Sequence, residues 1–184
     1  DKIRITKMMR WGLVPSWSKN AKISSKMINA RVETILEKPV FSGLVKSNRC
    51  IVLADGYYEW TRQHRQPYYI THLENKILPL AGLWTSWQSS SSNILSTYTV
   101  ITTSPVNSID HIHNRMPLIL DKNSIEKWID CNRFAISECL EDISLIKPDL
   151  RFYPVSKIVN SSKNNSAQNI KEEKPNHSLN FFNN

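Results

Sequence analysis

The sequence lacks the features that mark several large classes of protein. No segment approaches the ~18 consecutive apolar residues that a membrane-spanning helix requires. The first residues, Asp1 to Arg4, include neither an initiator Met nor the apolar stretch of a secretory signal. We therefore expect no membrane partner, and we expect the chain to begin at a processed end or partway into a longer protein.

Cysteine is also scarce. Cys50, Cys131 and Cys139 are odd in number and their spacing fits no metal site, so we expect neither a metal nor another cofactor. Few cysteines favour a reducing compartment, which would be the cytoplasm of a bacterium or the nucleus of a eukaryote. Cys50 follows Arg49 and precedes an apolar run, and we interpret it as a small core residue rather than a nucleophile.

Positive charge, by contrast, is in excess. The net charge is +8, and the first sixty residues contain eleven Lys and Arg against five Asp and Glu, so +6 of it lies there. Such clustering indicates a surface for polyanions, nucleic acid first among them. A solvated basic surface with no such partner is the alternative.

The pattern of apolar residues predicts one α+β domain over residues 1–160, with a strand-rich mixed sheet or barrel-like core and a few helices. The predicted strands lie within 3–17 and at 50–54, 57–61, 67–71, 78–84, 97–102 and 151–156. Residues 18–48 are irregular apart from a short helical segment at 32–36, and 89–93 form a flexible hairpin tip. Helices are predicted from Asn123 or Ser124 onward and over 135–145. We expect a monomer.

Residues 161–184 differ in composition from the rest of the chain. They are rich in Ser, Asn and Lys and nearly free of aliphatic residues before Leu179, which predicts a disordered polar tail. The apolar end, Leu179 to Phe182, is either a docking peptide or chance composition. It is similar to the apolar end of a sliding-clamp peptide, but it lacks that peptide's glutamine and spacing.

The segment Ile112 to Pro117 places His113 and Arg115 two residues apart beside an apolar run. In an extended segment both side chains project to one face, and a neighbouring cation favours the neutral imidazole that can act as a base. Arg115 suits an oxyanion, because a guanidinium forms paired hydrogen bonds with phosphate oxygens. The alternative for His113 is a hydrogen-bonded core residue.

Three other segments carry candidate site residues. Alternation places Glu59 on one face of its strand with Tyr57, where it is either a buried acid–base group or a surface charge. Asn29 and Arg31 share a face by the same rule and could hold a polar substrate and its phosphate. Trp17 lies in a loop, where it either stacks on a base or plugs one end of the core.

Taken together and in order, these segments resemble the SOS-response-associated peptidase (SRAP) family. The matching blocks are residues 10–17, 28–34, 49–60, 67–70, 99–103, 112–120 and 153–156. The resemblance implies a DNA-damage enzyme that traps abasic sites in single-stranded DNA. In that family an N-terminal cysteine condenses with the ring-opened sugar and closes a thiazolidine, and self-processing peptidase and lyase-like activities accompany it.

The resemblance also implies a role for each matching residue. Asn29 orients the deoxyribose, Glu59 is the acid or base for amine activation and self-processing, and His113 transfers the proton in ring opening and reversal. Arg31 and Arg115 match phosphate-binding arginines. Trp17 and Thr102 match positions beside the DNA.

One departure from the family stands out. The nucleophilic cysteine should open the chain in a Cys-Gly-Arg sequence, but this sequence opens with Asp1, and its three cysteines are all internal. As written, the chain is not expected to form the thiazolidine, and a fragment lacking an N-terminal segment is the interpretation we favour. A non-covalent single-stranded DNA-binding module is the alternative, and a basic protein unrelated to DNA is a third.

Overall fold

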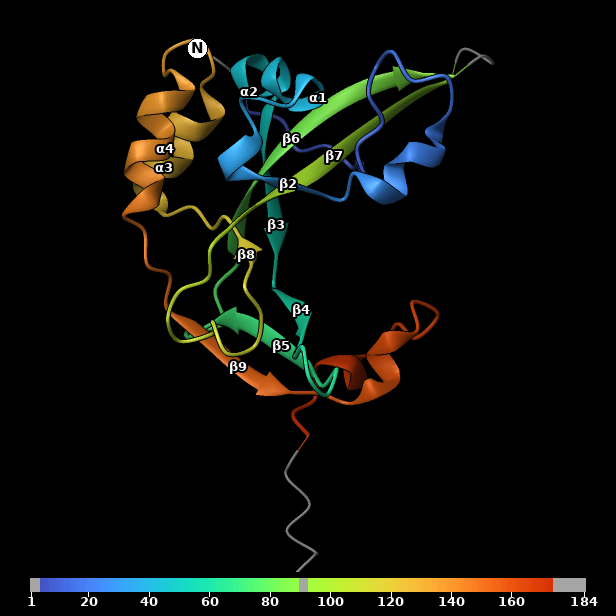
Figure 1. Ribbon diagram of the computed structural model, residues 1–184, viewed down its shortest axis with the longest axis vertical. Coiled ribbons are helices and arrows are strands. Elements are labelled where there is room, and N and C mark those ends of the chain that lie inside the picture. Colours follow the sequence, from blue (N-terminus) through green and yellow to red (C-terminus); the bar gives the residue numbers. More distant parts are fainter. Residues whose placement is uncertain (1–3, 90–92, 174–184) are drawn as a thin grey trace, which may run out of the picture.

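The computed structural model describes residues 4–89 and 93–173. Its strands form a six-stranded sheet and a three-stranded sheet, with short helices packed mainly against the larger one (Figure 1). The strands are β1 (Arg10–Trp11), β2 (Asn29–Arg31), β3 (Arg49–Ala54), β4 (Gly56–Trp60), β5 (Pro67–His72), β6 (Leu78–Gln88), β7 (Ile94–Thr103), β8 (Met116–Pro117) and β9 (Leu150–Pro154). The α-helices are α1 (Pro39–Ser42), α2 (Leu44–Ser47), α3 (Lys122–Ile129) and α4 (Ile136–Ser144). The 3-10 helices are η1 (Ala21–Lys26), η2 (Val32–Thr34), η3 (Lys157–Asn160) and η4 (Ala167–Ile170).

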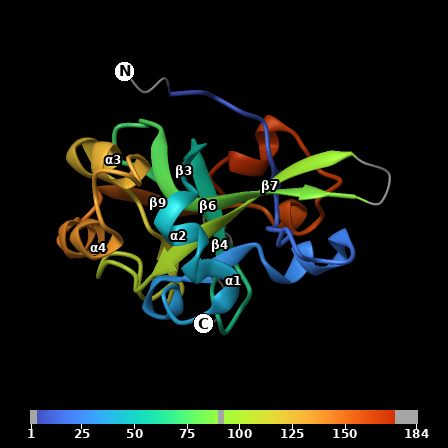
Figure 2. The same cartoon turned by 90° about the horizontal axis from the view of Figure 1, so that it is seen from above.

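The long antiparallel pair β6 and β7 organises the larger sheet. Strand β3 extends it on the β6 side, and β1, β2 and β8 all pair with β7, the first two in parallel. Most of β7 is buried because the sheet is covered on both faces there. Viewed from above, α3 and α4 lie to one side of the molecule and the β6–β7 hairpin extends to the other (Figure 2).

The chain passes directly from the larger sheet to the smaller one between β3 and β4, with only Asp55 between them. The smaller sheet has the order β4-β5-β9 and is antiparallel throughout. At the crossing, a Cβ on Gly56 would lie 2.5 Å from the Tyr69 ring and 2.6 Å from the Ile70 carbonyl oxygen. The absence of a side chain at Gly56 therefore lets β4 pack closely on β5 at the junction.

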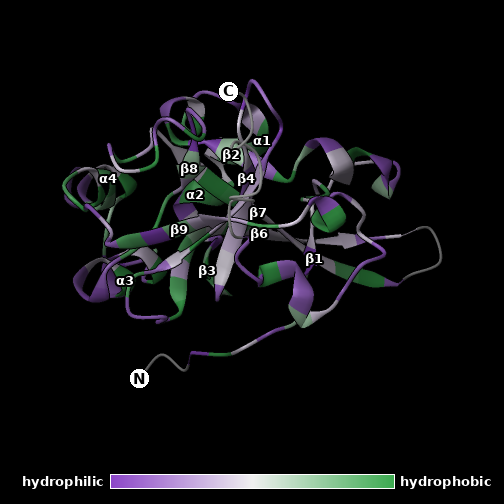
Figure 3. Cartoon of the chain, turned by 90° about the horizontal axis from the view of Figure 1, so that it is seen from below, coloured by the Kyte–Doolittle hydropathy of each residue, from purple (hydrophilic) through white to green (hydrophobic). Residues whose placement is uncertain are grey.

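The main core lies between the larger sheet and the four α-helices. It includes Leu83 and Ile101 from the sheet and the fully buried Trp128 of α3. Both α3 and α4 carry hydrophobic and hydrophilic residues along their length, as expected for helices that cover a sheet (Figure 3). Helix α3 begins with a capping box: Ser124 N donates to Asp121 Oδ1 at 2.7 Å, and Asp121 N donates to Ser124 Oγ at 2.9 Å.

The predicted α+β class is confirmed, with several differences in detail. The described strands form two open sheets rather than a barrel-like core, because the chain leaves the larger sheet after β3 and β4 pairs with β5. The strand expected within 3–17 shortens to Arg10–Trp11, and residues 18–48 contain β2, two 3-10 helices and two short α-helices. Helix α3 is capped by Asp121, not by Asn123 or Ser124. The tip of the 89–93 hairpin lies outside the described residues.

The structure also differs over the first part of the expected disordered tail. Residues 161–173 include η4 and run back against β9, where Glu173 N donates to Pro154 O at 2.8 Å and Tyr153 Oη donates to Ile170 O at 3.1 Å. These hydrogen bonds connect residues 170–173 to β9, whereas the disorder of the tail as a whole stays a prediction. The apolar end, Leu179 to Phe182, and with it the proposed clamp contact, lies outside the described residues.

Candidate functional site

Glu59 and His113 meet at the junction between the two sheets. Glu59 lies on β4 and His113 in the loop before β8, and His113 Nδ1 is 3.5 Å from Glu59 Oε2. Both side chains are partly buried, 24% exposed for Glu59 and 32% for His113. This contact favours the acid–base interpretation of Glu59 over a surface charge, and it places His113 next to a titratable partner.

The backbone around His113 Nδ1 suits a nitrogen that gains and loses a proton. Arg115 N lies 3.3 Å from it and can donate to the bare nitrogen. The carbonyl oxygen of Arg115, also at 3.3 Å, and the Glu59 carboxylate can accept from the protonated nitrogen. Since both states have hydrogen-bond partners, His113 can transfer a proton without leaving Nδ1 unsatisfied.

Burial raises the pKa of the Glu59 carboxyl above its ordinary value of 4.5, while the His113 imidazole and a hydrogen bond from Trp60 N oppose the rise. Tyr57, on the same face of β4, has a buried hydroxyl with no hydrogen-bond partner. Its pKa is raised by burial and by the Glu59 charge, so the phenol keeps its proton. Sequence reasoning placed Tyr57 beside Glu59 but gave it no role.

The raised pKa of Glu59 predicts a pH-dependent effect of Glu59→Gln on stability. The folded state holds this proton more tightly than the unfolded chain, so the carboxyl's contribution to stability falls as pH rises above about 4.5 through the folded pKa. Glutamine does not titrate, so the free energy of unfolding of Glu59→Gln minus that of the unmodified chain should increase over this range and then level off. Urea unfolding of both proteins between pH 4 and 7 measures it. A difference that is flat or falls with pH would contradict the assignment.

Arg115 is held by Glu33 of η2 and Thr102 of β7. Its Nη1 and Nη2 form a two-pronged ion pair with Glu33 Oε1 and Oε2 at 2.6 and 2.9 Å. Nη2 also donates to the Thr102 carbonyl oxygen at 2.5 Å and lies 3.4 Å from Thr102 Oγ1. His113 and Arg115 therefore have different partners, and the chain bends at Asn114 between them, so they do not form a side-by-side pair on an extended segment.

Thr102 is buried, and it holds Arg115 through its carbonyl oxygen and its hydroxyl. Glu33 lies within the matching block 28–34, where no role was assigned to it, and its spacing of two from Arg31 was the available signal. The Arg115 guanidinium lowers the pKa of Glu33, which keeps this carboxyl charged at neutral pH.

Asn29 and Arg31 lie at the same corner of the larger sheet. In the parallel pairing of β2 with β7, Arg31 is opposite Thr102 and Asn29 is opposite Val100. Both are exposed while Ala30 between them is buried, so they share one face as the alternation predicted. The pairing of β2 with β7 thus brings Asn29 and Arg31 next to Thr102, which holds Arg115. From Arg115 the backbone leads two residues back to His113, which contacts Glu59.

Trp17 is 70% exposed, which excludes the interpretation that it plugs the core. Its loop starts from Gly12, whose φ of +103° is a conformation that favours glycine and whose added Cβ would lie 2.6 Å from the Ser24 carbonyl oxygen. Trp11, also exposed, donates from Nε1 to the Ile28 carbonyl oxygen at 2.8 Å beside β2. Trp17 is therefore presented from the loop after β1, and Trp11, on β1 itself, lies beside the start of β2.

The remaining sequence predictions concern the cysteines, metals and membranes. All three cysteines are free, and burial raises the pKa of Cys50 to about 12, as expected for a core thiol. Within residues 4–89 and 93–173, no group of three or more His, Cys, Asp and Glu side chains is placed to hold a metal ion. No helix in the same ranges is both long and apolar enough to cross a membrane.

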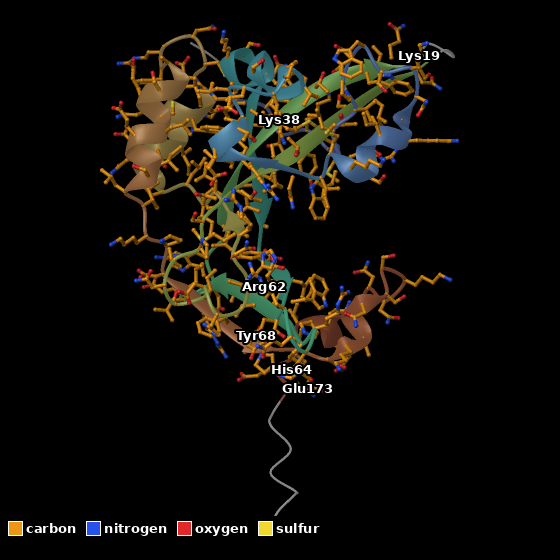
Figure 4. All side chains as sticks on the ribbon, viewed as in Figure 1. Lys19, Lys38, Arg62, His64, Tyr68 and Glu173 are labelled. Carbon is orange, nitrogen blue, oxygen red and sulfur yellow. The ribbon has the colours of Figure 1, made fainter. Side chains whose placement is uncertain are left out.

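Positive charge covers the surface of the N-terminal region. Eight Lys and Arg side chains between residues 4 and 38 are exposed against two exposed carboxylates, Glu33 and Glu37. Figure 4 labels two of the cations, Lys19 and Lys38, on the part of the molecule built on the larger sheet. A polyanion approaching β2 and the Trp17 loop would meet a favourable potential.

Comparison with known proteins agrees with these observations. Residues 1–162 match the SOS response associated peptidase (SRAP) family. The chain is 41% identical over 169 residues to abasic site processing protein YoqW of Bacillus subtilis (strain 168), covering 88% of this chain and 74% of that protein. It is 37% identical over 198 residues to abasic site processing protein HMCES of Mus musculus, covering 90% of this chain and 56% of that protein.

A crystal structure of a Bacteroides thetaiotaomicron protein has a similar fold. Its TM-score is 0.79 at 29% sequence identity, and the match covers 90% of this chain and 76% of the other. The family match extends over both sheets and through Glu59, His113, Arg115 and the β2 residues. The chain therefore belongs to the SOS response associated peptidase (SRAP) family.

Proposed function

We propose that this chain processes abasic sites in single-stranded DNA. The contact between Glu59 and His113 carries the proposal, because a carboxyl of raised pKa next to an imidazole can exchange protons with a reacting sugar. Processing of abasic sites is also the activity for which the similar proteins YoqW and HMCES are named.

The DNA would lie along β2 and the Trp17 loop. The exposed Trp17 ring offers a stacking surface for a base, which is worth about 1–3 kcal/mol per base. Arg31 is exposed at the end of β2 and can bind a phosphate, with Arg115 and Thr102 behind it. Asn29, on the same face of β2, would then orient the abasic sugar.

The chemistry proposed for this site is the crosslink that the family resemblance implies. The α-amine of an N-terminal cysteine adds to C1′ of the ring-opened sugar, and water leaves to give an imine. The thiol sulfur then adds to the imine carbon while its proton passes to the imine nitrogen, which closes a thiazolidine. Glu59 would take the proton from the amine and return one to the departing hydroxyl. His113 would transfer the proton that opens the sugar ring, and later the proton that reverses the crosslink.

This reaction requires a cysteine with a free α-amine. Cys50, Cys131 and Cys139 are internal, so none of them can supply it. The observation favours, as a second candidate, that the 184 residues by themselves bind single-stranded DNA without forming a covalent bond. The two candidates differ in a measurable product, a DNA adduct that survives denaturation.

DNA binding by the chain as it stands is the first test. Fluorescence anisotropy with a labelled single strand should show affinity that falls with salt, with a slope of about −0.7 per phosphate contact. Arg31→Gln should make that slope shallower by about 0.7. Lys147→Gln, an equal charge loss on the exposed chain after α4, should leave the slope near that of the unmodified protein. Equal effects of both variants, or no binding at low salt, would refute the proposed DNA surface.

Covalent trapping is the second test. The chain is joined at its N-terminus to a segment that begins with cysteine, and both forms are incubated with single-stranded DNA containing an abasic site. An adduct stable to denaturant is expected only from the cysteine-bearing form. No adduct from a folded, DNA-binding form would exclude the crosslinking chemistry and leave the binding module.

A further inference from the structure

The edge of Arg115 that suits a phosphate is filled by a carboxylate of the same chain. A guanidinium binds an oxyanion best through two parallel N–H bonds, and Nη1 and Nη2 of Arg115 make two such bonds to Glu33. The other N–H donors of Arg115 offer little to a second anion. Nη2 also donates to the Thr102 carbonyl oxygen, and Nε is buried without a hydrogen-bond partner. A phosphate can reach the paired donors only by replacing Glu33.

Of the two partners, Glu33 is the one that can move. Its side chain is 47% exposed, whereas that of Arg115 is 20% exposed and is held from behind by Thr102. Glu33 also belongs to η2, a single 3-10 turn immediately after β2, while Arg115 directly precedes β8, which pairs with β7. If the ion pair opens, the guanidinium stays on the sheet and the carboxylate turns into solvent.

The position of the ion pair is also that of the proposed DNA surface. Glu33 comes two residues after the exposed Arg31, and Arg31 is opposite Thr102, which holds Arg115. Glu33 therefore places a negative charge among the exposed cations of residues 4–38. A DNA strand following β2 would meet this carboxylate where it needs a cation.

We propose that Glu33 is an affinity-determining residue that occupies the phosphate-binding edge of Arg115 in the free protein and is displaced by a phosphate of single-stranded DNA. This inference rests on the proposed function, since it assigns the competitor for one phosphate of the same site. Loss of the carboxylate removes the competitor and leaves Arg115 available.

The test is a double-mutant cycle on DNA binding. The unmodified chain, Glu33→Gln, Arg115→Gln and the double variant are titrated against a fluorescein-labelled single strand without an abasic site, at several salt concentrations. Glu33→Gln should bind about fivefold more tightly, the effect of removing one competing surface ion pair, and with a steeper salt dependence. In the Arg115→Gln background the same change should alter affinity by no more than about twofold.

Glu37→Gln is the matched control, since Glu37 is the other exposed carboxylate of this region and its replacement changes the net charge equally. An effect as large as that of Glu33→Gln would overturn the inference in favour of general electrostatics. The inference would also be overturned if Glu33→Gln bound DNA no more tightly than the unmodified chain. The same holds if Arg115→Gln bound DNA as tightly as the unmodified chain. These outcomes presuppose that the unmodified chain binds DNA, whereas absence of that binding refutes the proposed function itself. Thermal unfolding of each variant confirms that it is folded.

Discussion

Replacing His113 with glutamine is expected to slow crosslink formation by about 100-fold or more, the usual contribution of a positioned general acid–base group. Glutamine keeps a hydrogen-bonding side chain next to Glu59 but cannot accept and release a proton at Nδ1. The rate is measured under single-turnover conditions with the cysteine-bearing form of the chain and single-stranded DNA containing an abasic site. Affinity for the same DNA should change little, because Arg31 and Trp17 are untouched.

His111→Gln provides the control for this prediction. His111 lies two residues earlier in the same loop, with its ring 5.4 Å from that of Phe152 and its side chain exposed. We expect it to react at nearly the unmodified rate. An equally slow His111→Gln would show that the loop, rather than the imidazole of His113, sets the rate.

Glu59→Gln should also slow the reaction, and the double variant Glu59→Gln/His113→Gln should be little slower than the slower single variant. The two side chains are in contact, so each loss changes the surroundings of the other group and the two losses should not add. Full additivity of the two losses in the free energy of activation would mean that the 3.5 Å contact is incidental.

Trp128→Ala is expected to cost about 3–5 kcal/mol in the free energy of unfolding, the range for removing a fully buried aromatic side chain. Trp128 has no exposed surface, and its Nε1 donates to the Cys50 carbonyl oxygen at 2.9 Å. The Arg49 guanidinium lies over its ring, 5.5 Å from the centroid. The substitution thus opens a cavity between α3 and β3 and leaves a buried carbonyl without its donor.

Trp17→Ala is the matched substitution at an exposed tryptophan. Since Trp17 is 70% exposed, its loss should change stability by less than about 0.5 kcal/mol. The same change should weaken binding of single-stranded DNA by about 1–3 kcal/mol if the ring stacks on a base. Chemical denaturation and fluorescence anisotropy on both variants separate the two roles. A stability loss below 1 kcal/mol for Trp128→Ala would contradict the packing described for the core.

The expected effects of the Glu59 and His113 substitutions depend on where the fold places these two side chains. The chain passes directly from β3, a strand of the larger sheet, into β4, which carries Glu59 in the smaller sheet, and Gly56 permits the close packing at the crossing. The loop bearing His113 then connects this junction to β8, which pairs with β7. The acid–base pair therefore lies between two sheets, which accounts for the partial burial and the raised pKa of Glu59.

Much of this organisation followed from the sequence alone. Period-two alternation correctly placed Asn29 and Arg31 on one face of β2, and the apolar runs at 50–54, 78–84 and 97–102 correctly predicted β3, β6 and β7. These predictions succeed because burial on a sheet repeats every second residue, so a short segment of sequence is enough to indicate it. The order of the motifs likewise indicated the family, which the match over residues 1–162 confirms.

Only the tertiary structure decided which side chains are partners. Nothing in the spacing of Glu59 and His113 states that they meet, and nothing in that of Glu33 and Arg115 states that the carboxylate fills the guanidinium's paired donors. Both contacts depend on how β2, β7 and β8 are ordered in one sheet and on where the chain passes from that sheet into β4. Strand order is fixed by contacts between residues distant in sequence, and a local pattern of polar and apolar residues does not specify those contacts.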